Sequence, residues 1–254
     1  MNWHRLFGLL LTDFFAGSPF DVELEKDLSA KKQILDVIIL RKRQGQFTGR
    51  LPDGFDQLAA HNLLTFKSYW EPLDDWTLKE LTGHYVNYRK QVSPTLEVLL
   101  PEEEFRLYAV SSRSPQKLAG AVELAPVQAG VYDCRRGSDV IRLIVAHELP
   151  KTENNSLLHL LSASPDQGRY GVEHYQQRSA DTSTLLNQLF EGYEREGLAM
   201  PYTIQDFRRD YVKEHLKDLT LEERLAGLSP DKIEKFLQRQ KHKPTPPKRK
   251  GKKK

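Results

Sequence analysis

Two charged residues interrupt the most apolar stretches of the sequence and are the first candidates for chemistry. Asp36 lies within the run ILDVIIL at 34–40, and Lys67 lies near the end of NLLTFKSY at 62–69. Both runs are rich in β-branched or aliphatic residues, which predicts buried strands. A carboxylate or an ammonium group in such a strand is costly to bury without a partner. The two residues therefore belong either to a substrate-binding site or to an ion pair across the sheet.

The alternation of side chains along a strand decides what surrounds each charge. With a period of two, Asp36 shares a face with Ile34 and Ile38. By the same alternation, Lys67 shares a face with Thr65. A buried Asp36–Lys67 pair would need good geometry and further hydrogen bonds to offset its desolvation. Residue types alone leave the site and the ion pair equally open.

Five short motifs, in their order along the chain, give a resemblance to a known family. They are HRLFGLLLTDFF at 4–15, ELEKDL at 23–28, LDVIIL at 35–40, NLLTFKS at 62–68 and LTGHYVNYRKQ at 81–91. With an aspartate on one strand, a lysine near the end of the next and a helix after it, the chain resembles the PD-(D/E)xK, or restriction-endonuclease-like, superfamily. More narrowly, the motifs are similar to those of bacterial proteins of the recombination-promoting nuclease and transposase-like type. The resemblance covers roughly residues 1–165.

This resemblance implies a fold, an activity and a set of site residues. The fold would be α/β, a mixed central sheet flanked by helices, with an α-helical C-terminal appendage. The activity would be metal-dependent cleavage of DNA, in recombination or in the movement of mobile elements. Asp36 and an upstream acid, Glu25 or Glu23, would bind Mg²⁺ or Mn²⁺, and Lys67 would orient water or stabilise the transition state. Alternatively, the acidic segment 20–28 is a solvated loop.

One residue departs from the family pattern. The position two before Lys67, which carries Glu, Asp or sometimes Gln in the superfamily, is Thr65 here. A hydroxyl is a weak and neutral metal ligand, so Thr65 could at most hold a water beside the ion. Glu71 or Asp56 could replace the missing carboxylate only by folding back towards Asp36. The alternative function is a catalytically silent nuclease-like domain that binds DNA or a protein partner.

A basic stretch follows the first predicted strand. Arg41, Lys42, Arg43 and Arg50 lie in the glycine- and proline-containing segment 41–56. Beside a nuclease site, these residues would contact backbone phosphates and position the scissile bond. In the alternative interpretation, they form the polar end of an edge hairpin.

Amphipathic helices are predicted at 2–16 and 75–91, where apolar residues recur every three to four positions. Asp13 lies in the last turn of the first helix and is either the helix-borne acid of a nuclease site or a solvated residue. Further strands are predicted at 104–112, 130–135 and 139–147, and a short buried helix at 155–163.

Charge is distributed unevenly along the 254 residues. The net charge is +3, but the segment KHKPTPPKRKGKKK at 241–254 carries eight of the 38 Lys and Arg residues and no acid. The remainder therefore has 30 basic and 35 acidic residues. This composition predicts a disordered basic tail that either adds phosphate contacts or only solubilises the terminus.

Composition also limits the compartment and the domain plan. A single cysteine, Cys134, excludes an internal disulfide framework, and scattered histidines give no zinc motif. The longest apolar run is too short for a membrane span, and we expect a cytoplasmic protein. We expect a nuclease-like domain over 1–165, a helical region over 166–240 that could serve homodimerisation or DNA contact, and the tail over 241–254.

Overall fold

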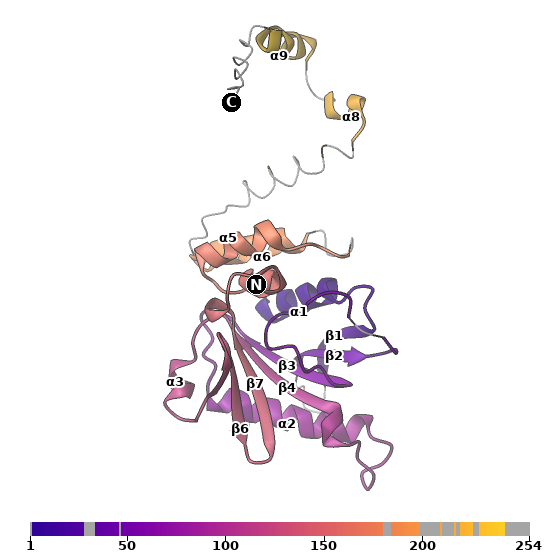
Figure 1. Cartoon of the computed structure of the whole chain (residues 1–254), viewed down its shortest axis with the longest axis vertical. Helices are drawn as coiled ribbons and strands as arrows, with labels where there is room; N and C mark the ends of the chain where they lie inside the picture. Colours follow the sequence, from indigo (N-terminus) through magenta and orange to yellow (C-terminus); the bar gives the residue numbers. More distant parts are fainter. Residues whose placement is uncertain are drawn as a thin grey trace, which may run out of the picture. The chain divides into compact units, whose positions relative to one another are not determined.

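The computed structural model describes residues 2–27, 34–45, 47–179, 184–198, 209, 216, 219–225 and 229–241. For residues 25–27, 232, 236–237 and 239–241 this description is limited to the backbone. The chain divides into two compact units, Met1–Ile204 and Gln205–Lys254. The first unit contains the sheet and its covering helices (Figure 1).

A seven-stranded mixed sheet forms the centre of the first unit, in the order β1-β2-β3-β4-β7-β6-β5. Strands β1, β2 and β3 are antiparallel neighbours, β3, β4 and β7 run parallel, and β7, β6 and β5 are again antiparallel. The strands are β1 (Phe20–Asp27), β2 (Ile34–Arg41), β3 (His61–Lys67), β4 (Phe105–Ser111), β5 (Ala125–Gln128), β6 (Val131–Arg136) and β7 (Asp139–Val145).

Helix α1 (Trp3–Phe14) packs on β1, β2 and β3. Asn2 caps its N-terminus by accepting a hydrogen bond from the Arg5 N–H at 3.1 Å. Its apolar stripe is fully buried, and Phe7 stacks on Phe66 of β3 with ring centroids 4.7 Å apart. The helix therefore holds the residues near its N-terminus at one end of the three antiparallel strands.

Helix α2 (Asp75–Val92) packs on β3 and β4. It brings Leu78, Leu81, Tyr85 and Tyr88 into a core with apolar residues of β2, β3, β4 and β7. Asp74 caps it by accepting a bond from the Thr77 N–H at 2.9 Å. The sheet thus has helices on both faces. The predicted class, α/β with a mixed sheet flanked by helices, is confirmed.

The strands and helices predicted in the first 165 residues are all present with small shifts in their ends. The solvated-loop alternative for 20–28 is wrong for residues 20–27, which form β1 and pair with β2. Strand β5 was not predicted. The short helices are α3 (Gln116–Ala119), α4 (Ser156–His159), α5 (Pro165–His174) and α6 (Leu185–Arg195).

Helices α5 and α6 lie in the first unit, where they pack on α4 and α1 respectively. Tyr193 of α6 donates a hydrogen bond to the Leu160 carbonyl at 2.6 Å, and its ring lies 4.9 Å from that of Trp3. The helical region that begins after residue 165 is therefore shared between the two units.

The second unit contains α8 (Leu221–Leu225) and α9 (Pro230–Lys241) among its described residues. Thr220 and Glu223 exchange side-chain to backbone hydrogen bonds of 2.8 and 3.3 Å at the start of α8 and so form a capping box. Most of residues 199–218 of the predicted helical region, all but 209 and 216, and the tail beyond Lys241 lie outside the described residues.

Candidate active site

Asp36 lies where β2 and β3 separate. The described pairing of the two strands reaches Val37 and Leu64 and stops there. Beyond that point, the Asp36 Oδ2 atom accepts hydrogen bonds from Thr65 Oγ1 at 2.9 Å and from the Phe66 N–H at 2.8 Å. The carboxylate therefore replaces the backbone hydrogen bonds between β2 and β3 at this point and fixes the end of β3.

A histidine from α1 reaches the same carboxylate. The His4 Nδ1 atom lies 2.9 Å from Asp36 Oδ1, a close charge contact that lies off the line of a hydrogen bond. The other ring nitrogen, Nε2, lies 3.1 Å from Glu71 Oε1. Glu71 also accepts bonds from the Ser68 N–H at 3.1 Å and the Ser68 hydroxyl at 2.8 Å. One imidazole ring thus joins two carboxylates from different segments.

The electrostatics of this group favour a protonated ring. The contacts with Asp36 and then Glu71 raise the pKa of His4 from 6.5 to about 9, against the opposing effect of burial. In turn, the bonds from His4 and then Ser68 lower the pKa of Glu71 from 4.5 to about 2. At neutral pH an imidazolium cation lies between two ionised carboxylates, because the two carboxylates supply the charge that holds its proton.

These pKa shifts predict a pH-dependent stability. The contacts that raise the His4 pKa stabilise the fold fully below pH 6.5, and this stabilisation is lost as pH rises through about 9. The contacts that lower the Glu71 pKa stabilise the fold fully above pH 4.5, and this stabilisation is lost as pH falls through about 2. We expect the contribution of the His4–Glu71 contact to be largest between pH 4.5 and 6.5.

The measurement compares the free energy of unfolding of the wild type and His4→Gln by urea titration between pH 5 and 9. Because the group is partly exposed, we expect the wild type to lead by about 1–2 kcal/mol near pH 6 and the difference to shrink towards pH 9. A difference that grows with pH would contradict the assignment.

Lys67 does not pair with Asp36. The Val37–Leu64 register makes Thr65 the neighbour of Asp36 across the strands, with Lys67 two residues further along β3. No hydrogen bond or ion pair joins the Lys67 side chain to any residue in the described part of the chain. The ion-pair interpretation is therefore wrong, and Lys67 is a half-buried cation near the carboxylates without a fixed partner.

The two upstream acids lie on β1, next to β2. The pairs Leu24–Val37 and Lys26–Leu35 put Glu25 directly opposite Asp36 in register, although its side chain is outside the described residues. Glu23 pairs with Ile38, and its Oε1 atom lies 3.8 Å from the Lys42 ammonium group. Of the two, Glu25 has the backbone position nearer to Asp36.

The basic stretch lies at the other end of β2. Asp36 is near the beginning of that strand and Arg41 closes it, five residues or about 16 Å away. There Arg43 donates to the carbonyls of Gly17 and Ser18 at 2.9 and 2.8 Å. Lys42 lies near Asp21 and Glu23, and Arg50 lies 3.3 Å from Asp53. The sequence led us to expect these side chains beside Asp36, but the structure places them at the opposite end of β2.

Asp13 is neither solvated nor next to Asp36. Its side chain is fully buried and accepts bonds from the Arg178 N–H at 3.0 Å and the Ser179 N–H at 2.5 Å. The Tyr175 hydroxyl also donates to it. Asp13 therefore holds the segment after α5 against the end of α1, nine residues along the helix from His4.

Of the two acids considered as substitutes, only Glu71 approaches the site. It reaches Asp36 through His4, whereas Asp56 lies 3.1 Å from Arg142 on β7. His4 was part of a motif but was not predicted as a site residue. A histidine at the start of an amphipathic helix gave a weak signal, because the two contacts that define its role span 32 and 67 positions in sequence.

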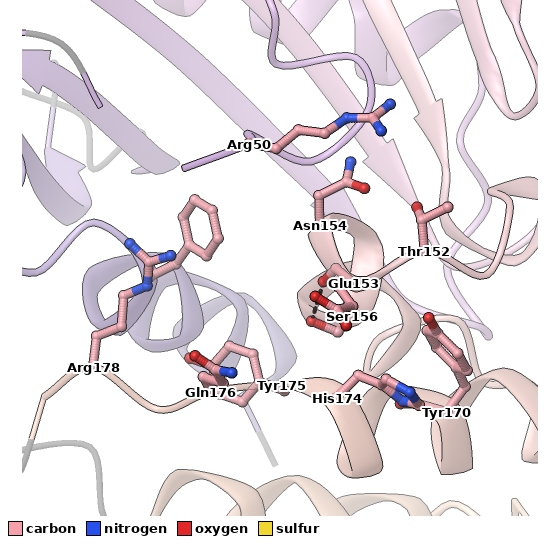
Figure 2. Close-up of a pocket in the computed structure, with 11 residues that line it drawn as sticks. Arg50, Thr152, Glu153, Asn154, Ser156, Tyr170, His174, Tyr175, Gln176 and Arg178 are labelled. Carbon is pink, nitrogen blue, oxygen red and sulfur yellow. Dashed lines mark hydrogen bonds between the residues drawn. The ribbon is translucent and has the colours of Figure 1, made fainter. Parts of the chain in front are cut away.

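A hollow of about 550 Å³ that includes Arg50 in its lining is a separate feature (Figure 2). It lies by the C-terminal end of α1, between Arg50, Asn154, His174 and Arg178, and includes none of Asp36, Thr65 or Lys67. The Arg178 guanidinium stacks over the Phe14 ring at 4.8 Å, which fixes one wall. The acidic group is not in this hollow but at the edge of the sheet.

Within the described ranges, no three His, Cys, Asp or Glu side chains converge as a metal-binding group. None of the helices in that part of the chain has the length and apolarity needed to cross a bilayer. No family model, no curated protein and no solved structure matches the chain.

Proposed function

We propose that this chain is a metal-dependent DNA endonuclease with a restriction-endonuclease-like core. The observation that carries the proposal is the junction of Asp36 with the strand that ends in Lys67: the carboxylate bonds to Thr65 and Phe66, and α2 follows. This is the arrangement of acid, lysine strand and helix that the family resemblance implies. A role in recombination and a cytoplasmic location belong to the same proposal.

The donor types around Asp36 suit Mg²⁺ or Mn²⁺, which bind carboxylate oxygens. Asp36 and Glu25 would hold the ion, because they are opposite each other on adjacent strands. When bound, such an ion polarises the substrate phosphate and acidifies a nearby water. The described residues alone provide fewer than three such donors, so the Glu25 side chain is needed to complete the site.

The chain's own side chains supply orientation and charge. Thr65 and the Phe66 N–H fix the Oδ2 atom of Asp36, whereas the Oδ1 atom lies 2.9 Å from His4 Nδ1. Lys67 has no fixed partner, and its ammonium group can therefore stabilise charge that develops on the phosphate. His4 neutralises part of the negative charge of Asp36 and holds the partly exposed Glu71 carboxylate beside it.

The second candidate function is a silent nuclease-like domain that binds DNA or a protein. It is favoured by one observation, the imidazolium between Asp36 and Glu71, which supplies a positive charge where carboxylates would otherwise attract a cation. Thr65 in place of a carboxylate also weakens the binding of a cation at this site.

Plasmid cleavage by the purified protein separates the two. We expect nicking or linearisation with Mg²⁺ or Mn²⁺ and none with EDTA. Lys67→Ala should lower the rate by about tenfold to 100-fold, since one charge-stabilising group is lost. Lys90→Ala removes an exposed lysine near the far end of α2 and should leave the rate unchanged. Absence of cutting with either metal, while salt-sensitive DNA binding is retained, would establish the silent domain instead.

A further inference from the structure

One edge of the sheet brings together the ends of several strands. The parallel strands β3, β4 and β7 end there at Lys67, Ser111 and Val145, which are paired in register. Because β2 runs antiparallel to β3, Asp36 near its beginning lies at the same edge. In open α/β sheets, ligands bind at the carboxyl ends of the strands. What surrounds this edge therefore decides which substrate can reach Asp36.

Two cations at this edge form no ion pair among the described residues, although the Lys67 charge helps to lower the pKa of Asp74. Lys67 ends β3, and Arg113 lies two residues beyond the end of β4, which is joined to β3 there by the Ser112 N–H and the Lys67 carbonyl at 3.0 Å. The Arg113 guanidinium makes one described side-chain contact, over the Tyr69 ring at 5.2 Å. By contrast, arginines such as Arg89 and Arg142 elsewhere in the first unit are paired with acids.

An exposed aromatic ring continues this contact. Tyr69 meets Trp70 edge to face, with centroids 4.8 Å apart, and the Trp70 residue is 60% exposed. A large apolar ring left in water is informative, whereas scattered small apolar residues are not. We define the aromatic–basic face as Lys67, Tyr69, Trp70 and Arg113. Its first residue, Lys67, ends β3, the strand that carries Thr65.

We propose that the aromatic–basic face binds an unpaired, single-stranded segment of the DNA substrate, with a base stacked on Trp70 and its phosphates on Arg113 and Lys67. Bases in single strands expose the flat π-surface that aromatic side chains bind, and the adjacent cations follow the backbone. In a duplex, these base surfaces are covered by stacking. This inference rests on the proposed function, because it names the form of DNA that the site receives.

The geometry gives each residue of the face a separate task. Arg113 is held over Tyr69, so it presents a positioned rather than a free charge. Lys67 follows Thr65 by two residues, so a phosphate bound by Lys67 lies close to the Asp36 carboxylate. A strand bound along the face would therefore deliver a backbone phosphate from Trp70 towards Asp36. The substrate class that results is DNA with single-stranded ends, gaps or loops.

Fluorescence anisotropy of labelled oligonucleotides tests this in EDTA, where no metal-dependent cutting occurs. The full-length protein is titrated into an oligo-dT strand and into a duplex of equal length, at several salt concentrations. We expect the single strand to bind at least tenfold more tightly. Trp70→Ala should weaken its binding about tenfold, and Arg113→Ala should also lower the slope of log K against log salt by about 0.7.

Two variants serve as matched controls. Trp76→Ala removes the other strongly exposed tryptophan, which is 65% exposed and has no described contact with Arg113. Arg135→Ala removes an exposed arginine of β6. Both should bind the single strand as the wild type does.

Failure of this inference can be told apart from failure of the proposed function. Equal affinity for single strand and duplex, or unchanged binding by Trp70→Ala and Arg113→Ala, would overturn the single-strand assignment even if plasmid is cut. Self-association that depends on Trp70, without DNA binding, would show a protein interface and also overturn it. Single-strand binding lost in both variants supports it, even if the protein cuts no DNA and the endonuclease proposal fails.

Discussion

Replacing Asp13 with Ala is expected to lower the free energy of unfolding by about 3–5 kcal/mol, because three donors lose their acceptor and each unsatisfied buried donor costs about 1–3 kcal/mol. The substitution leaves the Arg178 and Ser179 N–H groups and the Tyr175 hydroxyl without the fully buried carboxylate that accepts their hydrogen bonds. It also opens a small cavity at the end of α1. Urea denaturation followed by circular dichroism measures the loss.

Two further variants test the cause. Tyr175→Phe removes one donor but leaves both backbone bonds to Asp13, so it should cost only about 1 kcal/mol. Asp21→Ala removes an exposed acid of β1 and should change stability by less than about 0.5 kcal/mol. If Asp13→Ala behaved like Asp21→Ala, the carboxylate would not hold the segment after α5.

Replacing Asp36 with Asn is expected to abolish cleavage, with a loss of at least about 100-fold in rate, while the protein remains folded. The amide oxygen can still accept the bonds from Thr65 and Phe66, so the end of β3 should keep its place. What is lost is the negative charge that would hold a divalent ion. Supercoiled plasmid cleavage measures the rate, and thermal unfolding checks the fold.

Asp21→Asn makes the same chemical change at the opposite end of the β1–β2 pair, where Asp21 pairs with Leu40. It should cut DNA at the rate of the wild type. Equal rates for wild type and Asp36→Asn would show that any cleavage comes from another site or from a contaminating nuclease.

The sequence predicted the strands and helices around Asp36 because their patterns are local. Strand β2 is aliphatic from Ile34 to Leu40 except for Asp36, and α1 and α2 have clear apolar stripes. Strand β1 was harder to separate from a loop because its exposed positions are acidic. Its alternation of Phe20, Val22 and Leu24 with charged residues was nevertheless the signal of an edge strand.

The side-chain partners in the site could not be predicted in the same way. Lys67 was the natural partner for Asp36 by charge, but the register places Thr65 beside Asp36 instead. The cation that does contact Asp36 comes from α1, and its position depends on how that helix packs on the sheet. Asp13 was misjudged for the same reason, since its donors lie more than 160 residues away.

The basic stretch shows how neighbours in sequence can be distant in space. Arg41, Lys42 and Arg43 follow Asp36 closely along the chain, but an extended strand carries them away from it. Arg113 comes from the end of β4 and could be placed at the sheet edge only once the β3–β4 pairing was known. The residues that approach the site are therefore set by strand order rather than by sequence proximity.

The most direct test of the proposed site is the binding of Mn²⁺, followed by the loss of the free-ion signal in electron paramagnetic resonance. We expect one bound Mn²⁺ per wild-type chain, binding lost in Asp36→Asn, and binding weakened in Glu25→Gln. Binding that is absent in the wild type, or that is unchanged in Asp36→Asn, would contradict a metal site at Asp36 and favour the silent domain.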